Sequence, residues 1–206
     1  MPSLKSMPSM QSHPGSTDAG ACITGPEVPT NGIPHAAHAP PMPTPDLPRA
    51  IVLGAGSWGT ALAAMLGMRG VRTQFWGRDA GLMREMRETR RNARYLPALE
   101  LPESVSVATS LAGLESAEML VFVTPSKGVR ETARLVAESG LAAEARVILS
   151  CAKGIELDSG KRMSQILAEH FPGKALAVLT GPNHAEEVAQ QLATAAGRSE
   201  ERRVGK

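Results

Sequence analysis

The chain has 206 residues, 42% of them hydrophobic and 20% charged, which suffices for one domain with a hydrophobic core and excludes two domains of full size. The formal net charge of +2 excludes an electrostatic field strong enough to attract nucleic acid. No stretch of the sequence approaches the roughly 20 apolar residues that a membrane span needs. The two cysteines, Cys22 and Cys151, form no disulfide framework and no metal-ligand pattern. We therefore expect a cytoplasmic protein whose partners are small molecules.

Residues 1–49 are rich in proline and poor in aliphatic side chains. They hold 11 of the 16 prolines and cannot bury enough apolar surface to offset the entropy of ordering, so we predict a disordered tail. A transit peptide is the alternative, but such peptides are rich in arginine, and only Lys5 and Arg49 are basic here. Three histidines of this tail lack acidic partners at ligand spacing, so we expect no metal site. They are His13, His35 and His38.

Short apolar runs alternate with helix-like segments from residue 50 to residue 197, a pattern typical of an α/β domain with a parallel sheet. Six strands joined by crossover helices predict a doubly wound sheet. The predicted strands are Ala50–Leu53, Arg72–Trp76, Val105–Ala108, Met119–Thr124, Arg146–Cys151 and Ala175–Thr180. The predicted helices are Thr60–Arg69, Ala80–Arg91, Lys127–Glu138 and Lys161–His170.

A glycine-rich segment follows the first predicted strand. Gly54, Gly56 and Gly59 form the pattern G-x-G-x-x-G between that strand and the first helix. In this context the first glycine permits a tight turn, the second lets backbone N–H groups reach a pyrophosphate, and the third lets the helix pack closely on the strand. The helix N-terminus adds donors and a partial positive charge. The pattern predicts a dinucleotide-binding Rossmann domain, against the alternative of an ordinary glycine-rich turn.

The end of the second predicted strand bears on the choice of cofactor. An acidic residue in this region binds the ribose 2′-OH of NAD, whereas an arginine favours the 2′-phosphate of NADP. Arg78 comes first and Asp79 follows it. We therefore favour NADP(H), with NAD(H) retained as an alternative because of Asp79. Both residues could also belong to a solvated loop.

Two residues follow later strands at the same predicted edge of the sheet. Pro125 ends the fourth strand, and it either only stops that strand or contacts the nicotinamide side of the cofactor. Lys153 follows the fifth strand, beside the flexible Gly154. Its ammonium can pair with a substrate phosphate or carboxylate and hydrogen-bond the reacting oxygen, or it can be a solvated surface lysine.

The sixth predicted strand leads into a turn and a helix. Gly181 and Pro182 form the turn, Asn183 is expected to cap the helix, and the N–H groups of the turn would face an anion. His184 is a candidate general acid or base. A single histidine in a first helical turn is more often structural, and we favour that interpretation.

Four segments together resemble the bacterial NAD(P)-dependent glycerol-3-phosphate dehydrogenases. They are GAGSWGTALA from Gly54, FWGR from Phe75, CAKGIE from Cys151 and LTGPNHAEEVA from Leu179. The segment Asn92–Pro97 also resembles the family's N-x-x-Y-L-P pattern. The resemblance covers about residues 50–196 and implies reversible hydride transfer between the nicotinamide and dihydroxyacetone phosphate. The product, glycerol 3-phosphate, would serve phospholipid synthesis, and we expect the full-length protein to be a homodimer.

The resemblance also implies residue roles. Lys153 would be catalytic and would contact both the cofactor and glycerol 3-phosphate, and Gly181 and Asn183 would be the other substrate contacts. Asn183 stands where bacterial members usually have Ser or Thr, although its side chain can still donate a hydrogen bond. Besides the three glycines and Pro125, the residues implied at the NAD(P)H site are Ser57, Trp58, Arg78, Tyr95, Lys153 and Ala185.

The end of the chain departs from the family. Family members continue into an all-helical domain with a second lysine that transfers the proton, and this chain ends before it. Residues 198–206 are polar apart from Val204 and match one reading frame of a sequencing-adapter oligonucleotide, so we interpret them as non-native and expect the natural protein to continue. The fragment is then expected to bind cofactor but to turn over slowly or not at all. The alternatives are another reductase of the same superfamily and a non-catalytic NAD(P)-binding module.

Overall fold

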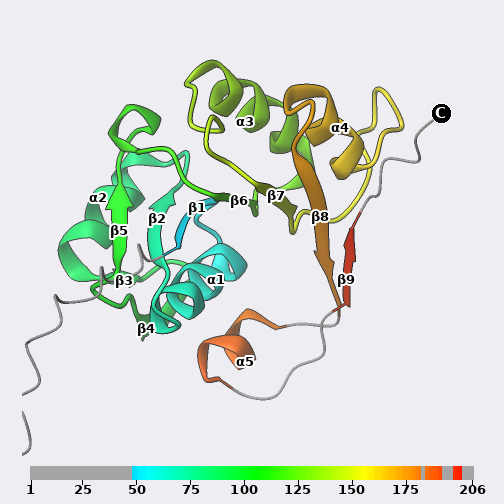
Figure 1. Cartoon of the computed structure of the whole chain (residues 1–206). Helices are drawn as coiled ribbons and strands as arrows, with labels where there is room; N and C mark the ends of the chain where they lie inside the picture. The colour runs from blue at the N-terminus through cyan, green and yellow to red at the C-terminus, as the bar shows by residue number, and fades with distance from the viewer. Residues whose placement is uncertain (1–47, 182–183, 192–196, 201–206) are drawn as a thin grey trace, which may run out of the picture. The chain divides into compact units, whose positions relative to one another are not determined.

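A seven-stranded sheet forms the centre of the domain (Figure 1). The structure is a computed structural model and describes residues 48–181, 184–191 and 197–200. The strand order is β5-β2-β1-β6-β7-β8-β9, in which all neighbours are parallel except β8 and β9. The strands are β1 (Arg49–Leu53), β2 (Arg72–Trp76), β5 (Val105–Ala108), β6 (Met119–Phe122), β7 (Val147–Ser150), β8 (Ala175–Thr180) and β9 (Gly197–Glu200).

The six parallel strands confirm the predicted doubly wound sheet. Numbered by their order along the chain, they lie in the order 3-2-1-4-5-6, which is the Rossmann arrangement. The strand order reverses between β1 and β6, where the connections leave in opposite directions. In open α/β sheets, ligands bind at such a switch point, outside the carboxyl ends of the strands.

The seventh strand and a separate hairpin were not predicted. β9 pairs with the free edge of β8 through main-chain hydrogen bonds, which depend little on side-chain pattern. The interpretation of residues 198–206 as non-native stays a prediction, and the tail predicted over residues 1–49 falls almost wholly outside the described residues.

The hairpin comprises β3 (Arg91–Asn92) and β4 (Leu96–Glu100). β3 has only two residues, both polar, and the apolar residues of β4 (LPALE) do not alternate with polar ones.

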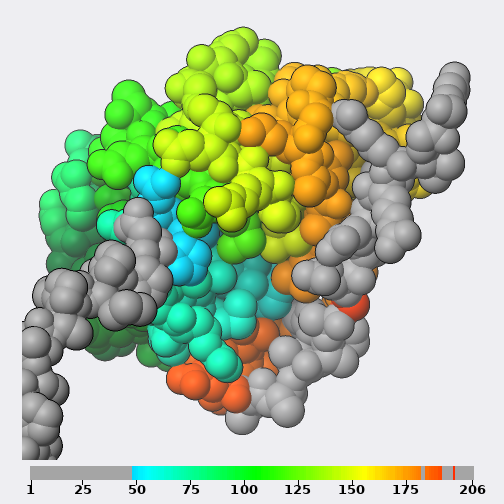
Figure 2. All heavy atoms as spheres, viewed as in Figure 1, coloured from blue at the N-terminus to red at the C-terminus, as the bar shows by residue number. Residues whose placement is uncertain are grey.

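Helices cover the two faces of the sheet as two groups, one on each face. On one face, α1 (Ser57–Met68) and α2 (Ala80–Thr89) pack on the strands, and α5 (Ala185–Ala189) lies against α1 (Figure 2). On the other face, α3 (Ser126–Glu138) packs beside α4 (Met163–His170). A short 3-10 helix, Leu111–Gly113, precedes β6.

All four predicted helices are present, with boundaries that differ from the prediction by up to three residues, and two of these differences have a clear cause. The helix predicted to reach Arg91 ends at Thr89, because Arg90 adopts a left-handed conformation (φ 59°) and the chain enters β3. The helix predicted to start at Lys161 starts at Met163, because Arg162 forms an isolated β-bridge with Ile155.

The central strands are buried on both faces. Ile51 and Leu53 pack into the core with α3 and α4, whereas Val52 between them packs into the core with α1 and α2. All three side chains are completely buried. This two-sided burial explains why the strand reads as a continuous apolar run rather than as an alternation.

The glycine-rich turn brings α1 against the end of β1. Gly54 has φ +127°, a conformation that L-residues rarely adopt, and a Cβ there would lie 2.7 Å from the backbone of Val123 in the neighbouring connection. A Cβ on Gly59 would lie 1.8 Å from the carbonyl oxygen of Gly54. A side chain at Gly59 would therefore push α1 away from the end of β1, and one at Gly54 would push the turn away from the connection after β6.

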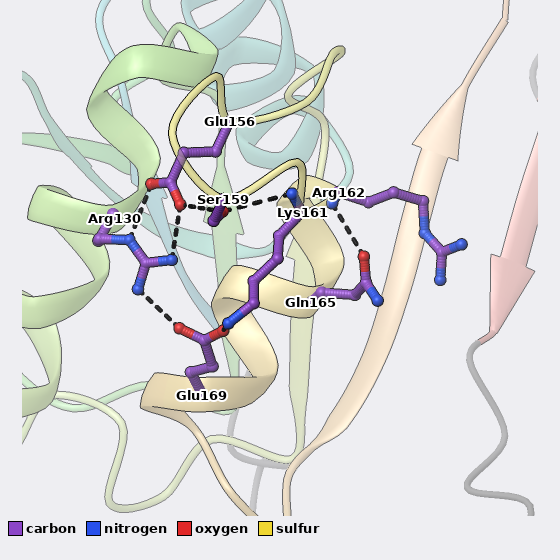
Figure 3. A network of polar contacts seen from close by, with 7 residues as sticks. All are labelled: Arg130, Glu156, Ser159, Lys161, Arg162, Gln165 and Glu169. Carbon is purple, nitrogen blue, oxygen red and sulfur yellow. Dashed lines mark hydrogen bonds and ion pairs between the residues drawn. The ribbon is translucent and has the colours of Figure 1, made fainter.

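A network of charged side chains holds the long connection after β7 against α3 and α4 (Figure 3). Arg130 of α3 donates two hydrogen bonds to Glu156, with Nε–Oε1 at 2.8 Å and Nη2–Oε2 at 2.7 Å. Its third nitrogen, Nη1, lies 2.6 Å from Oε2 of Glu169 on α4, and Lys161 pairs with the same carboxylate. The Ser159 hydroxyl also donates to Glu156. The network thus holds the connection at Glu156, three residues after Lys153.

We expect Gly59→Ala to lower the free energy of unfolding by more than about 2 kcal/mol, because the added methyl group would overlap the Gly54 carbonyl. Gly56→Ala is the matched control. A Cβ on Gly56 meets no atom within 4 Å, and its φ of −80° suits any residue, so its unfolding free energy should stay close to that of the wild type. Denaturant unfolding measures both, and equal stability of the two variants would contradict this packing argument.

The charged network predicts a pH-dependent contribution from Glu156. Hydrogen bonds from Arg130, and then from Ser159, hold the pKa of Glu156 at about 2, below its ordinary value of 4.5. A depressed pKa stabilises the fold above the unfolded-state value, and this stabilisation is lost as the pH falls through the folded-state value. Glu156→Gln should therefore lower the thermal midpoint at pH 7, and its difference from the wild type should vanish as the pH approaches about 2.

The check is thermal unfolding of both proteins between pH 7 and pH 2. Glu88→Gln, on the exposed part of α2, serves as the control for removing one surface carboxylate. A difference between Glu156→Gln and the wild type that did not change with pH would contradict the role of the network.

Candidate functional site

One large pocket opens at the carboxyl ends of the parallel strands, at the switch point between β1 and β6. Its volume is about 760 Å³, within the range of small-molecule and cofactor sites. The segments that follow β1, β2, β6, β7 and β8 all contribute to it. Its lining includes all but one of the residues proposed from the sequence, namely Gly54, Gly56, Ser57, Trp58, Gly59, Arg78, Tyr95, Pro125, Lys153, Gly181 and Ala185.

The glycine-rich turn presents an open backbone surface to this pocket. Gly56 precedes α1 directly, and the space that its Cβ would occupy is empty of protein atoms within 4 Å. The first turn of α1, with Ser57 and Trp58, continues the same wall. Free N–H groups at a helix N-terminus, reached without a side chain in the way, suit the pyrophosphate of a dinucleotide. The residues present therefore fit the cofactor that the sequence predicts.

The two charged residues after β2 have different roles in the structure. Asp79 caps α2, since its Oδ1 accepts hydrogen bonds from the backbone N–H groups of Gly81 at 3.0 Å and Leu82 at 3.1 Å. Its Oδ2 lies 3.6 Å from the guanidinium of Arg94. Both residues line the pocket, and Arg78 lies with its guanidinium over Gly128, at the start of α3. Asp79 is thus already engaged as a helix cap, whereas Arg78 faces the ligand space.

Lys153 and Gly181, which are 28 residues apart in the sequence, meet at the other side of the pocket. The Nζ of Lys153 donates a hydrogen bond to the carbonyl oxygen of Gly181 at 3.1 Å. Lys153 and its neighbour Gly154 are both exposed, so the ammonium faces solvent on its remaining sides. Pro125, for which two roles were open, occupies the N-cap position of α3 and lines the pocket, whereas β6 already ends at Phe122.

His184 lines the pocket and is the backbone cap of α5, but its side chain makes no capping hydrogen bond. The predicted cap and substrate contact, Asn183, lies outside the described residues. The structure therefore leaves the role of Asn183 as a prediction.

Cys151 is also part of the pocket wall, but its chemistry is not that of a nucleophile. Burial raises the pKa of its thiol to about 12, and a hydrogen bond with Trp58 only partly opposes this shift. The thiol therefore stays protonated and unreactive near neutral pH.

Sequence reasoning gave no role to several residues that the structure brings into the pocket. Lys127 enters from the first turn of α3 and adds a third cationic side chain beside Arg78 and Lys153. Its position directly after a strand end was the available signal. Thr124 also lines the pocket, and its buried hydroxyl has no hydrogen-bond partner among the described residues. The remaining lining includes Leu82, Ser126, Gly128 and Glu186.

Two other kinds of site find no counterpart in the described part of the chain. No helix in the described ranges is both long and apolar enough to cross a membrane. Within those same ranges, no three His, Cys, Asp or Glu side chains gather where they could hold a metal ion.

Comparison with known proteins identifies the family. Residues 49–203 match the family model described as NAD-dependent glycerol-3-phosphate dehydrogenase N-terminus. A glycerol-3-phosphate dehydrogenase [NAD(P)+] of Chlorobium luteolum is 43% identical over 147 residues, which cover 69% of this chain and 44% of that protein. The corresponding protein of Desulfitobacterium hafniense is 43% identical over 143 residues, covering 69% of this chain and 40% of its own length.

Solved structures agree with this match. A glycerol-3-phosphate dehydrogenase from Coxiella burnetii superposes with a TM-score of 0.69 at 32% identity, covering 76% of this chain and 47% of that one. The enzyme from Plasmodium falciparum, at 22% identity and a TM-score of 0.67, shows the same fold. The chain spans less than half the length of these relatives. It belongs to the family of NAD-dependent glycerol-3-phosphate dehydrogenase N-terminal domains, a family whose cofactor is NAD(P) and whose Rossmann fold it shares.

Proposed function

We propose that this chain is the cofactor-binding part of an enzyme that interconverts dihydroxyacetone phosphate and glycerol 3-phosphate with NAD(P)(H). The observation that carries the proposal is one pocket that joins the glycine-rich turn to Lys153 and Gly181. The first feature suits a dinucleotide, and the second places a cation beside it for a small anionic substrate. Both features lie within residues 49–203, which match the family model.

Lys153 is the residue that we assign to the substrate. When bound, the cofactor supplies or accepts the hydride. The ammonium of Lys153, held by the Gly181 carbonyl at 3.1 Å, has two further hydrogens for a substrate phosphate or for the reacting oxygen. We further propose Gly181 and Asn183 as substrate contacts, with Ser57, Trp58, Tyr95, Pro125 and Ala185 along the cofactor.

We propose a preference for NADP(H) over NAD(H). A carboxylate selective for NAD must be free to accept hydrogen bonds from the ribose, but Asp79 already accepts two from the backbone of α2 and pairs with Arg94. Arg78 lines the pocket and offers a planar set of donors that suits a phosphate.

The chain alone is expected to bind cofactor without efficient turnover. Lys153 cannot both transfer the proton and hold the substrate phosphate, so the reaction needs groups from beyond this chain. The full-length protein is proposed to be a cytoplasmic homodimer that supplies glycerol 3-phosphate for phospholipid synthesis.

The proposal is tested by titrating the 206-residue chain with NADPH and NADH, followed by an assay of dihydroxyacetone phosphate reduction. We expect saturable binding in the micromolar range and almost no turnover, with turnover appearing when the chain is joined to the C-terminal half of a relative. Binding of neither nucleotide would overturn the cofactor assignment. Persistent absence of turnover in the joined protein would leave a non-catalytic NAD(P)-binding module instead.

Arg78→Gln should weaken NADPH binding by about tenfold and leave NADH binding nearly unchanged, because only NADPH carries the phosphate that the guanidinium would pair with. Arg84→Gln is the matched control, since Arg84 is an exposed arginine of α2 that does not line the pocket. If Arg78→Gln weakened the binding of NADPH and NADH equally, that result would contradict the proposed preference for NADP(H). Fluorescence titration of each variant with each nucleotide gives the comparison.

A further inference from the structure

Asn92, at the end of β3, is a completely buried amide that bonds to the cofactor-binding turn rather than to its own hairpin partner strand. Its Nδ2 donates hydrogen bonds to the carbonyl oxygen of Ala55 at 3.1 Å and to the hydroxyl of Thr60 at 2.7 Å. Its Oδ1 accepts from the backbone N–H of Tyr95 at 3.2 Å. Both amide hydrogens and one acceptor site are therefore in use.

Thr60 closes this set of bonds around the glycine-rich turn. Its hydroxyl is buried, accepts from Asn92 and donates to the carbonyl oxygen of Gly56 at 2.8 Å. The carbonyl groups of Ala55 and Gly56, which belong to two successive peptide units, are therefore each held by a side chain. Because each peptide unit is planar, fixing these two carbonyls also fixes the directions of the N–H groups of Gly56 and Ser57.

We propose that Asn92, acting with Thr60, is a positioning residue for the dinucleotide: it holds the glycine-rich turn in the orientation that aims its N–H groups at the pyrophosphate. This inference rests on the cofactor binding proposed above. The turn contains Gly54 and Gly56, whose backbones are intrinsically permissive, so without a constraint it would lose conformational entropy when the cofactor binds. Hydrogen bonds that order the turn beforehand remove part of that cost.

The same amide couples a second wall of the pocket to the turn. Tyr95, which is 40% exposed, lines the pocket, and its backbone N–H donates to Oδ1 of Asn92. The neighbouring Arg94 stacks over the Tyr95 ring at 5.2 Å and pairs with Asp79 at the end of β2. The short hairpin thus connects two loops that follow different strands, and Asn92 supplies its buried hydrogen bond to the glycine-rich turn.

The test compares three variants of the 206-residue chain by fluorescence titration with NADH and with NADPH. Asn92→Ala and Thr60→Val each remove hydrogen bonds to the turn. Both variants should bind NADH and NADPH more weakly by the same factor of about ten, because the two nucleotides share the pyrophosphate. Thr60→Ser keeps the hydroxyl and should bind like the wild type. This pattern differs from that of Arg78→Gln, which should affect NADPH alone.

Thr73→Val separates positioning from general loss of stability. Thr73 is 1% exposed, its hydroxyl donates to the Val71 carbonyl at 3.1 Å, and it lies near the start of β2, away from the carboxyl edge of the sheet. Thermal unfolding of every variant is measured beside the titrations. Weakened binding in Thr60→Val but not in Thr73→Val, at a comparable loss of thermal midpoint, supports the proposal.

Three results would overturn it. Wild-type affinity in both Asn92→Ala and Thr60→Val would remove the positioning role while leaving the proposed function intact. An equal loss of binding in Thr73→Val would show that the effect is one of stability alone. Failure of the wild-type chain to bind either nucleotide would remove the proposed function, and this inference with it.

Discussion

The close approach of α1 to the end of β1 is the constraint on which the rest of the site depends. No atom larger than hydrogen fits between Gly59 and the Gly54 carbonyl, where a Cβ would stand at 1.8 Å. Because the helix meets the sheet without intervening side chains, its N-terminus lies at the sheet edge with its N–H groups free. A dinucleotide site needs this arrangement before any charged side chain can contribute to binding.

Parallel topology then concentrates the other functional groups at the same edge. All six parallel strands point the same way, so the residues that follow them gather on one side although they are far apart in the sequence. Arg78, Lys127 and Lys153 come from three such segments and face one pocket. Their positive charge complements a ligand with several phosphates.

Two different kinds of support hold the loops of this pocket. On the side of the glycine-rich turn, a buried amide makes three hydrogen bonds, and loss of one partner would leave unsatisfied groups out of reach of water. On the side of Lys153, the support is the network of Arg130 with Glu156 and Glu169, which is partly exposed and screened by solvent and salt. The first support is the more rigid one, and it lies where the backbone itself must contact the ligand.

The sequence by itself determined the order of the strands along the chain and the glycine-rich turn, because periodicity and glycine spacing are local properties. These local patterns, together with the resemblance to a known family, named eleven of the residues that line the pocket. Only the tertiary structure decided what the neighbouring polar groups do. Asp79 and Arg78 are adjacent in sequence and both line the pocket, yet only Asp79 also caps a helix. The role of Asn92 depends on Ala55 and Thr60, which are 37 and 32 residues away. Such hydrogen bonds are set by how the elements pack, and no local pattern records them.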